Sequence, residues 1–508
     1  MNQKITRRTF LKVSSLTAAM AALAACNPAS GKATGQPGIS LNGLANPTSL
    51  SPISLTPAST DSLIAQTLRR ISFGPRLADL QHAQQIGISA YIEEQLNPDL
   101  PDNPEIDSLL QPLTTLTMSV ADRVALPNRY TPAIELMQAT LIRQSLSTRQ
   151  LYEMMVDFWS NHFNIYLYKS FDIFLKTDDD LNVIRKHALD TFPNLLMASA
   201  HSPAMLIFLD NATSTKDVPN ENYARELMEL HTISVNGGYT QQDIENAARA
   251  LTGWSITSQN DPNPGQFMFR PFIHDTGDKQ IMQLHIPAGG GIQDGEQLLQ
   301  FLAAQPMTAQ FLSTKLVRHF VSDNPPASLI TRAAATFSQT SGDIKQVLRT
   351  ILFSDEFKSS AGQKIKRPLE FCHSALRGLD AQVDFTRPVI LQILTQFGQL
   401  PFNWQTPDGY PDVSTAWINT SGMLNRWNFG LAVANSQIPG VSVDIQNLVK
   451  DGQSTEDKID LLSLNLIGEK LPSDARDILI NYASENTTSD ILQNLAGLII
   501  GAPHFQYR

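Results

Sequence analysis

Apolar side chains recur every three or four residues along most of the chain, which is the spacing of one face of an α-helix. Residues 61–74, DSLIAQTLRRISFG, begin with Asp61 as a capping residue and end on Gly74, with apolar positions at helical spacing between them. The same period runs through residues 149–167, 308–322 and 343–357. Alternating strand patterns are rare and short. The pattern therefore predicts an all-α fold, a single large domain of many helices.

Two helical segments share a pattern that indicates a weak internal duplication. Residues 343–357 (DIKQVLRTILFSDEF) and residues 490–505 (DILQNLAGLIIGAPHF) both begin Asp-Ile-x-Gln-x-Leu, continue with an apolar run and end on phenylalanine. Two copies do not make a solenoid, which stacks several repeats. We therefore expect two related helical units within one domain.

The first 25 residues have the pattern of an export signal, not of a folded segment. Arg7 and Arg8 precede Phe10, and an apolar stretch then runs to Ala25, which resembles a twin-arginine signal. This stretch is shorter than the roughly 20 residues of a membrane-spanning helix. It leads into LAAC, which resembles a bacterial lipobox with Cys26 as the lipidated residue. We predict a signal peptide over residues 1–25 and a lipid anchor at Cys26, on the periplasmic face of the envelope or in the outer membrane.

The segment after the anchor differs in composition from the rest of the chain. Residues 26–60 are rich in Pro, Ser, Thr, Gly, Asn and Ala and show no lasting period, which predicts a flexible tether. The helical domain is expected over residues 61–508. The later apolar segments are short or interrupted, so the membrane is expected to be a partner through the lipid anchor. A formal net charge of −10 argues against binding of the phosphate backbone, so no nucleic-acid partner is expected.

The well-marked catalytic motifs are absent from the sequence. It has no phosphate-binding glycine loop with its lysine, no Gly-x-Ser-x-Gly, no His-Glu-x-x-His and no Cys-x-x-Cys-His. Candidate chemistry must therefore be sought among individual polar side chains.

Residues 220–231, NENYARELMELH, hold the densest group of such side chains. On a regular helix capped by Asn220, Asn222, Arg225, Glu226 and Glu229 form one polar stripe, whereas Ala224, Leu227 and His231 form another. Glu229 and His231 then point apart and cannot share one metal ion. The polar stripe is either a surface row of weak salt bridges or a catalytic group in which Arg225 or a cation offsets the like charges of Glu226 and Glu229.

Two histidines continue apolar stripes in separate segments, His162 in WSNHF and His231 in MELHT. A histidine in such a position is more often a core residue than a ligand. If the two side chains meet, however, one carboxylate would complete a metal or general-base site. Asp210 in FLDN and Asp157 in VDFW are the candidates for that carboxylate. The sequence thus allows a divalent metal, with His162, His231 and Asp210 as its ligands.

A third group of candidates, HDTGDK at residues 274–279, lies in a loop between FMFRPF and the glycine-rich AGGG. Functional side chains concentrate in loops that a rigid scaffold positions. His274 and Asp275 are therefore candidates for acid–base catalysis, together with His162 and the Glu226–Glu229 pair. The alternative is a short His-Asp pair with no chemical role, because such pairs are common.

Several stretches follow one another in a recognisable order: LRRISFGP, VDFWSNHFN, HSPAMLIFLDN, NENYARELMELHTIS, YTQQDIENAARALTGW, HDTGDK, TAQFLSTKLVRHFVSDNPP, KIKRPLEF, GYPDVSTAWINTSGMLNRWNF and APHFQYR. From about residue 61 to the C-terminus, the chain resembles the bacterial domain of unknown function 1800 (DUF1800) family. The resemblance implies a large exported protein, often in the neighbourhood of a second exported protein with a sulfatase-like fold, and it implies no reaction. Ser234 and Gln305 depart from the family pattern, which has glycine and histidine there, so neither is expected to be essential.

Two hypotheses from different classes follow. The first is an envelope enzyme, a metal-assisted hydrolase of an extracytoplasmic polymer or ester, with His162, His231 or His274 as ligand or base and Glu226 or Glu229 as carboxylate. The second is a non-catalytic scaffold that binds an exported partner, in which the same side chains are salt bridges that fix the packing of helices.

Overall fold

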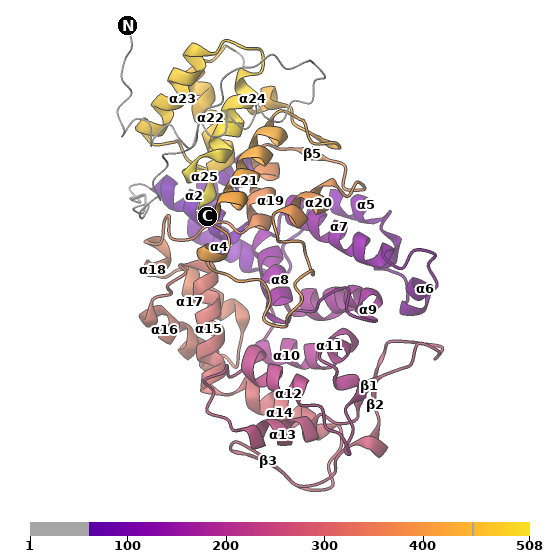
Figure 1. The fold of residues 1–508 in the computed structure, drawn as a ribbon. Helices are drawn as coiled ribbons and strands as arrows, with labels where there is room; N and C mark the ends of the chain where they lie inside the picture. The colour runs from indigo at the N-terminus through magenta and orange to yellow at the C-terminus, as the bar shows by residue number, and fades with distance from the viewer. Residues whose placement is uncertain (1–59, 450–451) are drawn as a thin grey trace, which may run out of the picture.

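The computed structural model describes residues 60–449 and 452–508, and helices make up most of this part of the chain (Figure 1). The predicted all-α class is confirmed, with three pairs of very short strands added. The predicted signal peptide, the lipid anchor at Cys26 and the tether up to residue 59 lie outside the described residues. None of the helices in the described ranges is long and apolar enough to cross a membrane.

The first third of the domain forms the middle of the molecule in Figure 1, with α8 near its centre. Its elements are α2 (Thr60–Ile71), α3 (Leu77–Ile86), α4 (Ile88–Leu96), α5 (Glu105–Leu110), η1 (Thr114–Leu116), α6 (Val120–Val124), α7 (Thr131–Leu146), α8 (Gln150–His162), α9 (Asp172–Asp179) and η2 (Asp180–Arg185). The helix predicted to follow Asp61 as its cap begins at Thr60 instead, so Asp61 lies within its first turn.

The second part of the chain forms the lower end of the molecule in Figure 1 and carries four of the short strands. Its elements are α10 (Phe192–Ala200), α11 (Pro203–Phe208), η3 (Asn211–Thr213), α12 (Glu221–Glu226), η4 (Leu227–His231), α13 (Gln241–Ala250), β1 (Trp254–Ile256), β2 (Phe267–Phe269), η5 (Pro271–Ile273), β3 (Lys279–Ile281), β4 (Leu284–Ile286) and α14 (Gln293–Ala303). β1 pairs with β2 and β3 with β4, both antiparallel. Strands of three residues are too short to show alternation, which is why the sequence pattern did not predict them.

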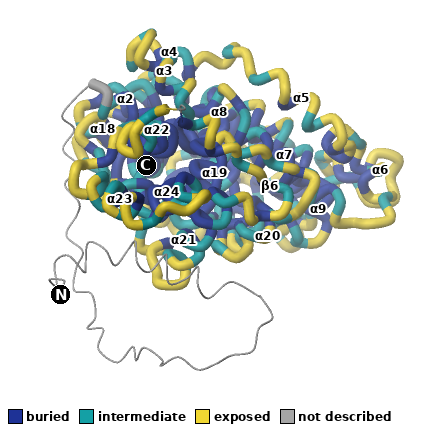
Figure 2. Tube along the Cα trace, turned by 90° about the horizontal axis from the view of Figure 1, so that it is seen from above, coloured by how far each residue is buried: buried dark blue, intermediate teal, exposed yellow. Residues whose placement is uncertain are grey.

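The last part of the chain returns to the centre and forms the upper end. Its elements are α15 (Pro306–Phe320), α16 (Ala327–Gln339), α17 (Ile344–Leu352), α18 (Asp355–Lys358), α19 (Pro368–Gly378), β5 (Gln382–Val383), α20 (Val389–Gln396), η6 (Ser414–Ala416), α21 (Thr420–Ala434), β6 (Val441–Ser442), η7 (Ile445–Leu448), α22 (Thr455–Ile467), α23 (Ser473–Glu485), α24 (Ile491–Gly501) and α25 (Pro503–Gln506). All residues of α19 are buried, and Figure 2 shows this helix within the buried part of the molecule.

The two segments with the shared Asp-Ile-x-Gln-x-Leu pattern have the same order of elements. In each, a helix that follows an aspartate (α17 or α24) leads into a short helix (α18 or α25) with a buried phenylalanine, Phe357 or Phe505. An internal duplication remains a prediction, now with matching local structure.

Arg70 on α2 connects segments that are far apart in the sequence. Its guanidinium is fully buried and donates to the backbone oxygens of Arg508 (2.6 Å), Phe320 (2.9 Å), Val321 (2.6 Å) and Ser360 (2.5 Å). Buried polar groups are costly unless hydrogen-bonded, and these bonds satisfy the guanidinium. The LRRISFGP stretch therefore fixes the end of α15 against the C-terminal segment.

Candidate active site

One cavity in the described part of the chain combines histidine, lysine, arginine and carboxylate side chains. It has a volume of about 330 Å³ and is lined by Phe158, Asn161, His162, Lys315, Arg318, His319, Arg367, Trp404, Asp408, Gly409, Tyr410, Pro411, Asp412 and Val413. The lining thus comes from α8, from α15, from Arg367 before α19 and from the loop of residues 404–413, which we call the cavity loop. Asp408 on this loop is exposed, so the cavity reaches the surface.

Two asparagines at the end of α8 hold the cavity loop in place. The Asn161 amide donates to the Tyr410 backbone oxygen (2.9 Å) and accepts from the Tyr410 backbone N–H (2.7 Å). Asn164 donates to the backbone oxygens of Trp404 (3.0 Å) and Thr406 (2.7 Å). Gly409 lies in the left-handed region (φ +74°), and a Cβ there would lie 2.2 Å from the Asn161 backbone oxygen. The loop therefore needs glycine at this position.

Lys315 and His162 form a hydrogen-bonded pair on one wall of the cavity. Lys315 Nζ lies 2.8 Å from His162 Nδ1, and His162 Nε2 lies 3.2 Å from the His231 backbone oxygen. The carbonyl requires a proton on Nε2, so Nδ1 accepts from the Lys315 ammonium. Burial, followed by the charge of Lys315, holds the pKa of His162 well below its usual range. Burial, assisted by the charge of Arg318 and opposed by Asp412, lowers the pKa of Lys315 to about 8.

His319 lies one helical turn after Lys315, so both side chains are on the same face of α15. Its Nδ1 donates to Asp412 Oδ2 (2.7 Å), and Asp412 forms an ion pair with Lys364 (2.7 Å). The buried Nε2 of His319 has no hydrogen-bond partner among the described residues. Burial, followed by the charge of Arg508, lowers the pKa of His319 to about 4. His319 is therefore neutral at pH 7, oriented by a carboxylate, with an unused lone pair on Nε2.

Asp412 stays ionised although it is partly buried. Burial raises the pKa of this carboxyl, but the positive charge of Lys364 and the hydrogen bond from His319 outweigh it and hold the pKa well below its usual range. A carboxylate that orients an imidazole in this way stabilises the imidazolium that forms when the imidazole accepts a proton.

The structure brings His162 and His231 together, with ring centroids 5.9 Å apart. His231 does not line the cavity, and burial lowers its pKa to about 3. Neither ring nitrogen of His231 has a hydrogen-bond partner among the described residues. Asp210, the predicted third ligand, instead forms an ion pair with Lys169 (2.9 Å) on the surface. Within the described residues, no group of three or more His, Cys, Asp or Glu side chains is arranged to hold a metal ion.

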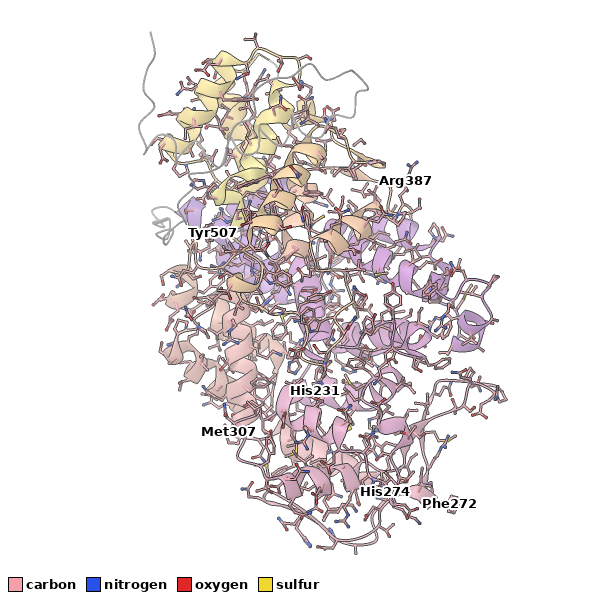
Figure 3. All side chains as sticks on the ribbon, in the orientation of Figure 1. His231, Phe272, His274, Met307, Arg387 and Tyr507 are labelled. Carbon is pink, nitrogen blue, oxygen red and sulfur yellow. The ribbon has the colours of Figure 1, made fainter. Side chains whose placement is uncertain are left out.

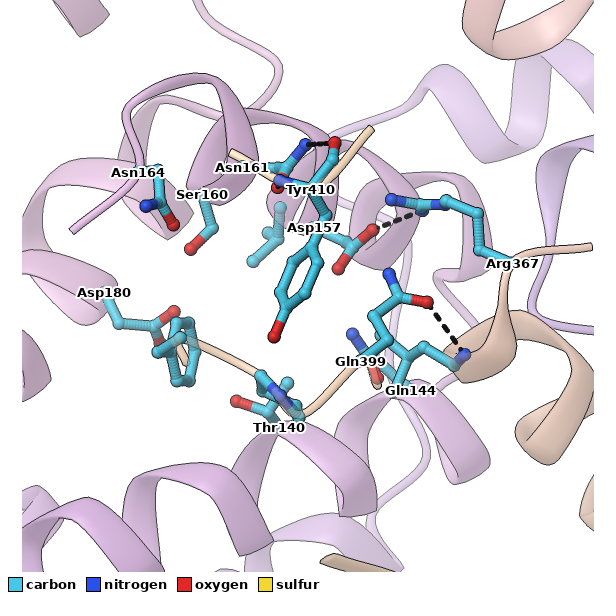
Figure 4. Close-up of a pocket in the computed structure, with 14 residues that line it drawn as sticks. Thr140, Gln144, Asp157, Ser160, Asn161, Asn164, Asp180, Arg367, Gln399 and Tyr410 are labelled. Atoms are coloured by element: carbon cyan, nitrogen blue, oxygen red, sulfur yellow. Dashed lines mark hydrogen bonds and ion pairs between the residues drawn. The ribbon is translucent and has the colours of Figure 1, made fainter. Parts of the chain in front are cut away.

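The other predicted carboxylate, Asp157, contacts Arg367 (2.6 Å), and burial raises its pKa despite this ion pair. It lines a separate chamber of about 30 Å³, enough for one or two water molecules, together with Tyr410 and Asp180 (Figure 4). Asn161, Arg367 and Tyr410 line both spaces, so this chamber lies next to the cavity.

The helix of NENYARELMELH is not regular. Asn220 caps it as predicted, but α12 ends at Glu226 and the chain continues as one turn of π-helix, η4, to His231. The predicted angles around the axis are therefore wrong beyond residue 226. The two faces nevertheless differ in environment, because His231 is buried whereas Glu229 is partly exposed.

Arg225, Glu226 and Glu229 lie outside the lining of the cavity. Arg225 pairs with Glu221 (3.1 Å) and with Glu229 (3.7 Å) in the helix. Burial, the charge of Glu229 and a smaller contribution from Asp408 of the cavity loop raise the pKa of Glu226. The carboxylate pair is thus close enough to the cavity loop for the charges to interact.

His274 and Asp275 belong to a separate polar network, and Figure 3 shows His274 well away from His231. His274 Nδ1 donates to the Thr252 backbone oxygen (2.7 Å), and its Nε2 lies 3.2 Å from Asp294. Lys279 pairs with the same Asp294 (2.8 Å), and Asp275 pairs with Arg249 (2.9 Å). These contacts fasten the HDTGDK loop to α13 and α14, and none of its residues lines the cavity.

Lys315, His319 and Asp412 were not among the candidates from sequence. A signal for two of them exists: Lys315 and His319 interrupt the apolar face of the 308–322 segment at positions four residues apart. Asp412 could not be paired with them from sequence, because 93 residues separate it from His319.

Comparison with known proteins gives a family and no activity. The family model described as "Protein of unknown function (DUF1800)" matches residues 66–507. No curated protein and no solved structure matches the chain.

Proposed function

This chain belongs to the DUF1800 family of proteins of unknown function, and we propose that it is a hydrolase that uses the cavity between α8, α15 and the cavity loop. The observation that carries the proposal is the His319–Asp412 pair, in which the His319 Nε2 has no hydrogen-bond partner among the described residues and Lys315 lines the same cavity one helical turn earlier. An imidazole oriented by a carboxylate is a general base, and an ammonium on the same helix face is suited to stabilise a developing oxyanion.

The proposed reaction is the addition of water to an ester. His319 Nε2 removes a proton from water while the water oxygen bonds to the acyl carbon. The Lys315 ammonium donates a hydrogen bond to the oxyanion, and Asp412 stabilises the imidazolium. The imidazolium returns its proton to the departing alkoxide when the ester C–O bond breaks, which gives an acid and an alcohol.

We further propose that the enzyme works in the cell envelope, exported by the twin-arginine route and anchored through Cys26. The export motif and lipobox of residues 1–26 support this location. A divalent metal also remains a proposal, for which His162 and His231 are the two adjacent candidates. Since both nitrogens of His162 are engaged, that metal would have to displace Lys315 from Nδ1.

The alternative is a scaffold for an exported partner, such as the neighbour with a sulfatase-like fold that the family resemblance suggests. It is favoured by the network of His274, Lys279 and Asp294, in which the first two buried side chains both pair with Asp294 and none of the three lines the cavity between α8, α15 and the cavity loop. In that account the polar residues hold helices together and none of them reacts.

The experiment is a screen of chromogenic esters with the wild type and His319→Asn. We expect hydrolysis by the wild type and a rate about 10²–10⁴-fold lower in the variant, which is the range for removal of a general base. His274→Asn serves as the matched control and should retain the wild-type rate. Hydrolysis that is equally fast in His319→Asn would refute the proposed base, and no hydrolysis of any ester would favour the scaffold.

A further inference from the structure

Two cations in the lining of the cavity, Lys315 and Arg318, form no ion pair within the described residues. The ion pairs of the lining residues are those of Arg367 with Asp157 and Glu370, and of Asp412 with His319 and Lys364. Lys315 and Arg318 therefore have no ion pair in the described ranges, and the buried Nε of Arg318 also lacks a hydrogen-bond partner there.

Neither carboxylate of the cavity lining forms an ion pair with these cations, although the charges of both act on Lys315 from a longer distance. Asp412 is engaged by Lys364 and His319. Asp408 accepts hydrogen bonds from Trp404 Nε1 (2.9 Å) and the Thr406 hydroxyl (2.5 Å) on its own loop. Burial and the positive charge of Arg318 lower the pKa of Lys315, and the more distant charges of Asp412 and Asp408 offset this only in part, so that the pKa is about 8.

Unpaired cations at a partly buried wall are costly, and an anionic ligand would offset that cost. Arginine suits this purpose, because its planar guanidinium presents two parallel N–H donors to a carboxylate or a phosphate. A cavity of about 330 Å³ is within the lower range of small-molecule sites.

Building on the hydrolase proposed above, we propose that the cavity takes a substrate with an anionic group, a carboxylate or a phosphate, and that Arg318 binds this group beside Lys315. In this arrangement Arg318 anchors the substrate, while Lys315 and His319 remain available to the ester bond. Arg318 is thus a binding residue that determines specificity.

The test measures binding, not turnover. Isothermal titration calorimetry of the full chain with inorganic phosphate and with acetate, each against chloride at equal ionic strength, should give one site for at least one anion. Which of the two binds identifies the anionic group. We expect Arg318→Gln to weaken binding about tenfold or more, because a hydrogen-bonded charge is lost. Arg332→Gln, which removes an exposed arginine paired with Glu356, is the matched control and should bind as the wild type does.

His319→Asn separates this inference from the proposed reaction, since it should lose hydrolysis and keep anion binding. Arg318-dependent binding without any hydrolysis would support the inference and reject the hydrolase. Absence of binding of both anions, or equal affinity in Arg318→Gln, would overturn the inference even if hydrolysis is observed. If Arg318→Gln does not fold, Arg318→Lys decides: it keeps the charge but loses the two parallel donors, so its affinity should fall several-fold, and unchanged affinity would overturn the inference.

Discussion

The chemistry proposed for the cavity depends on the protonation of individual side chains. His162 has both ring nitrogens engaged, by Lys315 and by a backbone oxygen, so its role is to position Lys315. His319 is the reverse case, because one nitrogen is bonded to Asp412 and the other is free. Two histidines that look alike in sequence thus have different uses, and only their partners distinguish them.

Asp412→Asn tests the orientation of His319. The amide removes the negative charge that stabilises the imidazolium, and its NH₂ group can favour the wrong tautomer of His319. We expect the rate of ester hydrolysis to fall about 10²-fold or more. The control is Asp323→Asn, since Asp323 pairs with the same Lys364 (2.8 Å) but does not contact His319. Equal losses in the two variants would mean that Asp412 acts only through Lys364.

At the scale of elements, the cavity depends on how the cavity loop is held against α8. Gly409→Ala places a Cβ 2.2 Å from the Asn161 backbone oxygen, so the loop has to move. We expect a loss of hydrolysis, or of anion binding, together with a lower melting temperature. Gly398→Ala is the matched control, because Gly398 also has a positive φ (+81°) but has open space around its Cβ position. If Gly409→Ala keeps full activity, the position of this loop does not matter for the site.

The helices were predictable because their apolar period is local: α8, α15 and α17 begin within two residues of the predicted segments, although α8 and α17 end five residues before them. The π-helical turn η4 could not be predicted, because Leu227–His231 continues the same apolar and polar pattern as a regular helix. The prediction that His162 and His231 could meet depended on tertiary packing, as did the pairing of His319 with Asp412. Sequence therefore located segments of the site, WSNHF above all, but not the residues that complete it.

At the scale of the whole molecule, buried neutral histidines make stability depend on pH. Burial lowers the pKa of His231 and of His373 to about 3, and that of His319 to about 4. An unfolded histidine has a pKa of about 6.5. Between these values the unfolded chain binds more protons than the folded chain, so stability falls as the pH falls below about 6.5.

The ionisation of Glu370 also makes the free energy of unfolding fall as the pH falls, but in a lower pH range. Burial opposes its ionisation, but the guanidinium groups of Arg367 and Arg508 outweigh burial and lower its pKa to about 2. Its stabilising charge is lost as the pH falls from about 4 toward that value. Asp157 and Asp172 have the opposite effect on the pH dependence of stability, because burial raises the pKa of each carboxyl.

Chemical denaturation at several pH values checks this account. The free energy of unfolding should be lower at pH 4.5 than at pH 7. Its slope against pH reports the number of protons taken up on unfolding, and His231→Asn should reduce that number by about one between pH 4 and 6.5. Equal stability at the two pH values, or an unchanged slope in the variant, would show that the buried histidines do not control acid stability.

The pH dependence of ester hydrolysis, compared between the wild type and Lys315→Arg, tests the central claim most directly. Catalysis needs neutral His319 and protonated Lys315, so the wild-type rate should fall below about pH 4 and above about pH 8. Arginine stays protonated, so the alkaline fall should disappear in Lys315→Arg while the acid fall remains. A wild-type rate that is constant through pH 8, or an alkaline fall that persists unchanged in Lys315→Arg, would contradict the assignment of this cavity as the active site.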